Sequence, residues 1–123
     1  MNAKKYALID LHLHLDGSLS LESARALAEK QKIDLPQDDA ELLNMLRVSE
    51  DCRDLNEYLE RFALPLTLLQ TKEAVTKAVS TLCNELYYEG LIYAEIRFAP
   101  QLHTQNGLTQ EDVVLAADRK SVV

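Results

Sequence analysis

The sequence DLHLHLDGS, residues 10–18, alternates polar and leucine side chains and then stops at a glycine. Successive side chains of a β-strand point to opposite faces, so this alternation predicts a strand with one polar face and one apolar face. The apolar face would hold Ile9, Leu11, Leu13 and Leu15. The polar face would hold Asp10, His12, His14 and Asp16. A protein core explains the apolar face, whereas the polar face requires partners.

The rest of the chain predicts an α/β fold around this strand. We expect the first strand over residues 6–15 and a second buried strand over residues 91–100. The expected helices cover residues 21–31, 40–47, about 55–69 and about 72–89, and a last helix begins at 109. The order strand, helices, strand, helix is typical of parallel α/β architecture.

Several helix ends carry their own signals. Ser20 and Thr71 are candidate N-caps, and the segment from Asp54 to Glu57 resembles a capping box with Asp in place of Ser or Thr. Gly90 lies where a glycine ends a helix, and Pro65 should bend or split the helix that contains it.

Composition excludes several classes of function. The chain has 123 residues, a net charge of −7 and a pI near 4.9, which argues against binding to a nucleic-acid backbone. Its apolar runs are too short to span a membrane, and no secretion signal is visible. Cys52 and Cys83 have no metal-binding spacing, and we expect free thiols in a soluble cytoplasmic protein.

The histidine pair has two interpretations. His12 and His14 are two residues apart on a strand, so both imidazoles should point the same way and could bind one zinc ion. Asp10 or Asp16 could then orient a ring or contact a substrate. In the other interpretation, both histidines are satisfied polar residues at a strand end. The flanking carboxylates and the following turn favour a site at the carboxyl end of a barrel strand.

Three blocks of sequence resemble one known family. HLHLDGSLS, YLERFALPLTLLQT and YAEIRFAPQLH resemble, in this order, the N-terminal part of the metal-dependent adenosine/AMP deaminases of the amidohydrolase superfamily. The resemblance extends from about residue 8 to residue 115. It implies the N-terminal part of a (β/α)8 TIM barrel, incomplete at about two strands plus several helices. It also implies one Zn²⁺ at the barrel mouth and a reaction in which water attacks C6 of adenosine to give inosine and ammonia.

The resemblance assigns roles by position. His12 and His14 match two zinc ligands, and Asp16 matches a carboxylate that contacts the 5′ side of the ribose. Tyr58, Leu59 and Phe62 fall in the segment that resembles an apolar lid over the purine, although helical spacing alone favours ordinary helix core for them. The substrate-binding set would be His14, Asp16, Gly17, Tyr58, Leu59 and Phe62.

Downstream polar residues are given structural roles. Glu95 and Arg97 should point into the barrel as a satisfied ion pair. His103 is interpreted as a solvated loop histidine without a metal role. The remaining zinc ligands and the general acid and base would lie on later strands, so we assign no catalytic residue and expect the chain alone to be inactive.

Two alternatives to an adenosine deaminase remain open. One is a deaminase for adenine or another 6-aminopurine, and the other is a short metal-binding or partner-binding module without turnover. For the domain organisation, we expect residues 1–117 to be barrel sequence. Residues 118–123 are predicted to be a non-native tail, because their six codons and a following stop match a common sequencing adapter.

Overall fold

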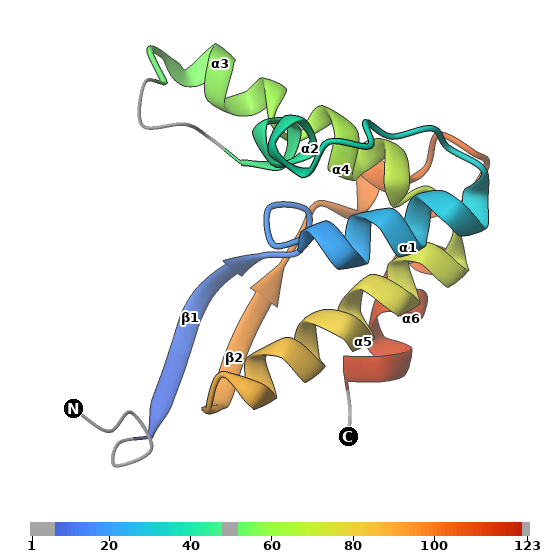
Figure 1. Cartoon of the computed structure of the whole chain (residues 1–123). Coiled ribbons are helices and arrows are strands. Elements are labelled where there is room, and N and C mark those ends of the chain that lie inside the picture. The colour runs from blue at the N-terminus through green and yellow to red at the C-terminus, as the bar shows by residue number, and fades with distance from the viewer. Residues whose placement is uncertain (1–6, 48–51, 122–123) are drawn as a thin grey trace.

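The computed structural model describes residues 7–47 and 52–121, and it places two parallel strands beside a layer of helices (Figure 1). The predicted order of strands and helices is confirmed, although residue 6 of the expected first strand lies outside the described residues. The elements are β1 Leu8–His14, α1 Leu21–Gln31, α2 Asp39–Leu46, α3 Leu55–Glu60, α4 Ala63–Leu68, α5 Lys72–Tyr88, β2 Leu91–Arg97, a 3-10 turn η2 Pro100–His103, and α6 Gln110–Ser121.

The predicted helix caps are present. Ser20 accepts a hydrogen bond from the N–H of Ser23, and Thr71 accepts one from the N–H of Ala74. Asp54 accepts from the N–H of Glu57 at 2.8 Å, as a capping box requires. These side chains satisfy N–H groups that have no partner within the helix, and so they fix where α1, α3 and α5 begin.

The expected helix over residues 55–69 is divided in two. α3 ends at Glu60 and α4 begins at Ala63, so Pro65 lies in the first turn of α4. Proline is tolerated there because the first N–H groups of a helix have no intrahelical acceptor. The predicted split is confirmed, and α3 and α4 are two successive helices (Figure 1).

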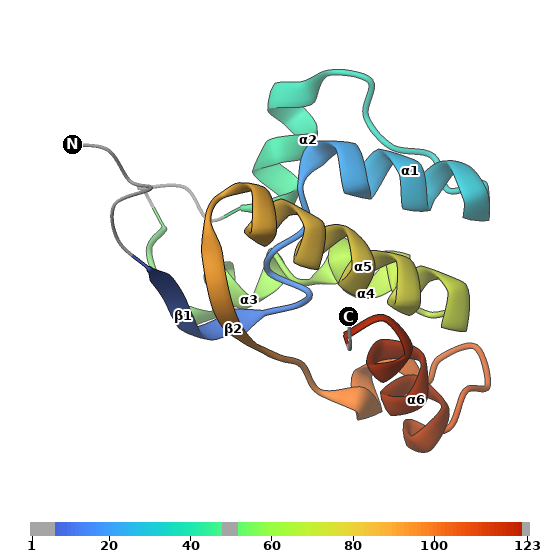
Figure 2. The ribbon, with the colours of Figure 1, turned by 90° about the horizontal axis from the view of Figure 1, so that it is seen from below.

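The core lies among the helices and not between the strands. α5 contacts α1, α6 and β2, and it runs between α1 and α6 when the molecule is seen from below (Figure 2). Leu15 enters this core directly after β1 and is completely buried. The other completely buried hydrophobic residues are Ala24, Leu42, Leu68, Leu69, Val75 and Val113.

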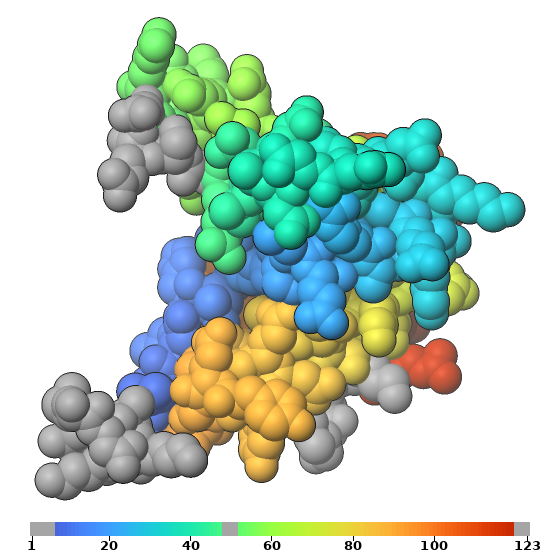
Figure 3. Space-filling model, in the orientation of Figure 1, coloured from blue at the N-terminus to red at the C-terminus, as the bar shows by residue number. Residues whose placement is uncertain are grey.

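The two strands are more exposed than predicted. Ile9, Leu11 and Ile92 expose 58%, 53% and 73% of their surfaces, so the expectation of two buried strands is wrong for this chain. Within the described residues, β1 and β2 pair only with each other, which leaves both outer edges open. β1 lies at the surface in the space-filling view (Figure 3). Strands of a parallel sheet are normally covered on both faces, and here the helices cover one.

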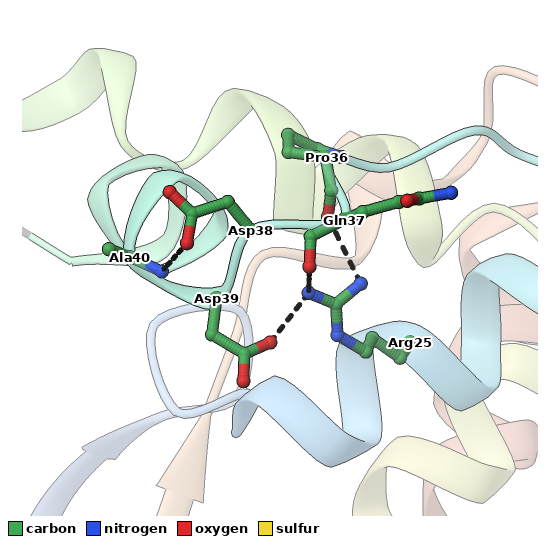
Figure 4. A network of polar contacts seen from close by, with 6 residues as sticks. All are labelled: Arg25, Pro36, Gln37, Asp38, Asp39 and Ala40. Carbon is green, nitrogen blue, oxygen red and sulfur yellow. Dashed lines mark hydrogen bonds and ion pairs between the residues drawn. The ribbon is translucent and has the colours of Figure 1, made fainter.

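Arg25 holds α2 onto α1. Its guanidinium donates to the carbonyls of Pro36 and Gln37 and contacts the carboxylate of Asp39 at 2.6 Å (Figure 4). Asp38 begins α2 by accepting from the N–H of Ala40. One arginine therefore organises the loop between the two helices.

The C-terminal helix crosses the predicted boundary after Ala117, because α6 continues to Ser121. The non-native origin of residues 118–123 stays a prediction, and residues 122 and 123 lie outside the described part of the chain. Among the described helices, none combines the length and the apolar character that crossing a membrane requires.

Candidate active site

A β-bulge in β1 contains the first histidine of the pair. Asp10 pairs with Ala94 of β2, and Leu13 pairs with Ile96. Three steps along β1 therefore match two steps along β2, so that one extra residue is inserted in β1 between these pairs. The inserted residue interrupts the regular alternation of side chains.

The bulge corrects the predicted face of Asp10. Ala94 and Ile96 are two residues apart on β2 and share a face, so their partners Asp10 and Leu13 also share one. His14 pairs with Arg97 and takes the opposite register position. The expectation that Asp10 shares a face with His14 is therefore wrong.

The rings of His12, in the bulge, and His14, after it, lie against each other. The Nε2 atoms of His12 and His14 lie 3.0 Å apart, and both side chains are exposed. Two Zn–N bonds of about 2.0–2.1 Å at a tetrahedral angle place the nitrogens about 3.3 Å apart. A separation of 3.0 Å is close to this value, so the pair fits two positions of a zinc site. No group of three His, Cys, Asp or Glu residues able to hold a metal occurs within residues 7–47 and 52–121.

A cavity of about 540 Å³ lies beside His14. It contains every expected substrate-binding residue except Gly17. Gly17 lines a neighbouring hollow of about 260 Å³, which also contains His12. The residues that line the larger cavity are His14, Asp16, Tyr58, Leu59, Phe62, Leu66, Arg97, Phe98, Ala99 and Leu102. Side chains from the end of β1, from α3 and α4, and from the end of β2 therefore converge on one space.

Asp16 is the most buried polar group of this cavity. Its side chain is 8% exposed, and its Oδ1 finds no hydrogen-bond partner among the described residues. A buried carboxylate oxygen without a partner is costly, because it loses its hydration without compensation. A ligand hydroxyl that donated to Oδ1 would remove this cost.

The aromatic side of the cavity comes from Tyr58 of α3 and from Phe62, which directly precedes α4. Tyr58 and Phe62 meet edge to face with ring centres 5.5 Å apart. Tyr58 is 41% exposed and Leu59 is 52% exposed, so the alternative of ordinary helix core is wrong for these two residues. Both side chains border the cavity, and their role as a lid over a purine stays a prediction.

Comparison with known proteins supports the predicted family. The family model "Adenosine deaminase" matches residues 7–120. This chain belongs to the adenosine deaminase family. An adenosine deaminase of Haemophilus ducreyi is 57% identical over 116 residues, which are 94% of this chain and 34% of that protein. An adenosine deaminase of Enterococcus faecalis is 45% identical over 108 residues, which are 88% of this chain and 32% of that protein.

Solved structures show the same fold. An adenine deaminase from Arthrobacter aurescens matches with a TM-score of 0.75 and 31% identity over 92% of this chain and 34% of that one. An N6-methyl-AMP deaminase from Arabidopsis thaliana matches with a TM-score of 0.56 and 24% identity over 93% of this chain and 32% of that one. The chain spans about a third of the length of these relatives. Its fold, a part of an α/β barrel, is therefore confirmed.

Two downstream residues of this family member differ from expectation. No ion pair joins Glu95 and Arg97 in the described structure. Arg97 instead donates from Nη2 to the carbonyl of Leu11 at 3.1 Å. Glu95 accepts from the hydroxyl of Tyr93 at 3.0 Å, and this hydrogen bond raises the pKa of Tyr93. The reason is geometric, because the bulge leaves a carbonyl within reach of the guanidinium.

His103 was expected to be a solvated loop histidine, but it is buried. η2 turns its ring beneath the junction of α4 and α5, where its Nδ1 lies 2.8 Å from the carbonyl of Leu69. Nδ1 must carry the proton, because a carbonyl only accepts. Its Nε2 is buried and has no partner in the described part of the chain. The ring also meets Phe98 edge to face.

Sequence reasoning missed the far wall of the cavity. Leu66, Phe98, Ala99 and Leu102 line it, and none of them carries a polar group that would single it out. The block RFAPQLH contains three of the four, so its resemblance to the family was the available signal.

Proposed function

We propose that this chain supplies part of the active site of a zinc-dependent adenosine deaminase, which converts adenosine and water to inosine and ammonia in purine salvage. One observation carries the proposal. His14 borders the same cavity as Asp16, whose buried Oδ1 has no partner among the described residues, and the ring of His12 lies against that of His14. A metal-binding pair beside a hydroxyl acceptor suits a nucleoside that has a reactive ring and a sugar.

The residues would divide the work as follows. His12 and His14 would hold Zn²⁺, which supplies the Lewis acidity that activates water near neutral pH. Asp16 would accept a hydrogen bond from a ribose hydroxyl and so fix the position of the nucleoside. Tyr58 and Phe62 would cover the purine and exclude bulk water. No general acid or base is assigned within this chain, and we expect the isolated chain to be inactive.

Adenine is the second candidate substrate. The solved structure with a TM-score of 0.75 is that of an adenine deaminase, whereas the curated relatives at 57% and 45% identity are adenosine deaminases. The buried carboxylate of Asp16 favours a nucleoside, because a free base has no sugar hydroxyl to donate.

We place the protein in the cytoplasm, since Cys52 and Cys83 are both free thiols.

A chimera tests this function. The matching segment of the Haemophilus ducreyi enzyme is replaced by the 116 residues of this chain that align with it. Inosine formation from adenosine, hypoxanthine formation from adenine, and bound zinc are measured. We expect adenosine deamination, with His12→Ala removing both zinc and activity. A folded, zinc-loaded chimera that acts on adenine alone would establish the second candidate. One that acts on neither would support a module without turnover.

The isolated chain provides the complementary measurement. Pure 123-residue protein with added zinc should form no inosine above background. Inosine formation that disappears with His12→Ala would contradict the expected inactivity.

A further inference from the structure

We propose that Asp10 and Arg97 are positioning residues for the histidine pair, because they hold the β1 bulge in the form that brings the two imidazoles together. The inference rests on the proposed metal role of His12 and His14. It concerns how this chain arranges that pair before any metal binds.

Asp10 stabilises the N–H side of the bulge. The bulge takes His12 out of regular pairing with β2. The backbone N–H of His12 instead donates to Oδ1 of Asp10 at 2.9 Å. This hydrogen bond spans two residues and closes a small turn within the strand. Asp10 therefore acts on the backbone of a candidate ligand and not on its ring.

Arg97 stabilises the carbonyl side of the bulge. The carbonyl of Leu11 accepts from Nη2 of Arg97 at 3.1 Å. Arg97 is also the ladder partner of His14, and its carbonyl accepts from the N–H of Leu15 at 2.9 Å. One residue of β2 thus ties together the bulge, the second histidine and the start of the turn that carries Asp16.

The bulge matters because it sets which way each imidazole points. A slip of one residue in pairing moves a side chain to the opposite face of a strand. Between His12 and His14 the observed backbone gives an Nε2 separation of 3.0 Å. Removing either side-chain contact leaves a strand N–H or carbonyl to be satisfied by another arrangement, in which the rings no longer converge.

The test measures binding of Ni²⁺ to the complete 123-residue chain by calorimetry, with His12→Ala as the background. Arg97→Met and Asp10→Ala should bind Ni²⁺ about 10- to 100-fold more weakly than the unmodified chain. This is the usual loss of metal affinity, about 10- to 100-fold, when a group that orients a metal ligand is removed. Asp10→Asn keeps the acceptor oxygen and should restore binding. Arg25→Met is the matched control, because it removes an arginine whose contacts are with Pro36, Gln37 and Asp39 and not with the bulge, and it should leave the affinity unchanged.

Several outcomes would overturn the inference. Equal Ni²⁺ affinities for Arg97→Met, Asp10→Ala and Arg25→Met would show that the bulge contacts do not position the pair. Absence of binding by the unmodified chain would show that the pair is not pre-arranged, while zinc and activity in the chimera would still decide the proposed function. If circular dichroism shows that Arg97→Met does not fold, the Ni²⁺ affinities of Asp10→Ala and Asp10→Asn decide the question. Equal affinities for these two variants would overturn the inference.

Discussion

A Cβ atom on Gly17 would lie 3.3 Å from Cε1 of Phe62 and 3.6 Å from Cβ of His14. The turn after β1 therefore lies directly against an aromatic ring from the junction of α3 and α4. The strand that carries the proposed metal ligands and Phe62 of the proposed purine cover therefore approach each other at this turn. Small changes in the turn should be transmitted to the cover.

Gly17→Ala should displace Phe62 and weaken nucleoside binding, while zinc stays bound in the chimera. The backbone of Gly17 needs no left-handed conformation, so the effect would come from the contact alone. Gly107→Ala is the matched control. The φ of Gly107 is +90°, so an alanine there would strain the backbone, but its added Cβ atom would meet nothing within 4 Å. It should lower the free energy of unfolding by about 1 kcal/mol and leave KM unchanged. Equal KM values for Gly17→Ala and the parent would contradict the coupling.

Asp16→Ala should weaken nucleoside use while leaving the metal in place. A hydrogen bond to a charged group contributes about 1.5–3 kcal/mol, which corresponds to a loss of roughly 10- to 150-fold in kcat/KM for adenosine. Zinc content and kcat/KM are measured on the same chimera. Loss of zinc from Asp16→Ala would instead assign Asp16 to the metal site.

Gln70→Ala should destabilise the wall of the cavity. The buried amide of Gln70 donates to the carbonyls of Leu66 and Leu102 and accepts from the N–H of Gln105. Its loss leaves three backbone groups to be satisfied, and we expect unfolding to require about 3 kcal/mol less in urea titrations. Gln101→Ala, in the exposed part of η2, is the control and should change stability by less than about 0.5 kcal/mol.

Asp112 should make the start of α6 sensitive to acid. Hydrogen bonds from the N–H and hydroxyl of Thr109, with the charge of Lys72 nearby, lower the pKa of Asp112 below its ordinary value of 3.8. A lowered folded pKa contributes stability that is complete above 3.8 and lost as the pH falls through the lowered value. Asp112→Asn should therefore melt below the parent near neutral pH. The two melting temperatures should converge in strong acid, and a constant difference would disprove the linkage.

The isolated chain should self-associate through its strands. Ile92 is 73% exposed beside an open edge of β2, and exposed edges and apolar faces favour pairing with another chain. Ile92→Lys should shift sedimentation toward monomer. Leu115→Lys changes a residue of α6 that is 60% exposed and should not. Identical sedimentation of all three proteins would exclude the strands as the contact.

Helix ends could be predicted from the sequence because their signals are local. Ser20, Thr71 and Asp54 each satisfy an N–H within three residues, so no distant contact was needed to place them. Gly90 likewise ends its helix with a φ of +95°, a conformation that glycine adopts without strain.

Long-range contacts could not be predicted in the same way. The bulge in β1 depends on pairing with β2, which lies about 80 residues later, and strict alternation therefore misplaced Asp10. The burial of His103 depends on a carbonyl 34 residues away at Leu69. The histidine pair was singled out by its spacing on a strand, whereas Tyr58, Leu59 and Phe62 were assigned to a substrate site only because their sequence block resembles a family.

None of the six residues of α3 is buried, although Tyr58 and Leu59 border the cavity. An element with so little buried surface opens locally at low cost, whereas Asp16 is enclosed and follows a strand that Arg97 secures. The two sides of the cavity therefore differ in stiffness. The sugar of a bound nucleoside would lie against the rigid side of the cavity, at Asp16, and its base against the mobile side, at α3. The nucleoside would therefore enter and leave from the α3 side.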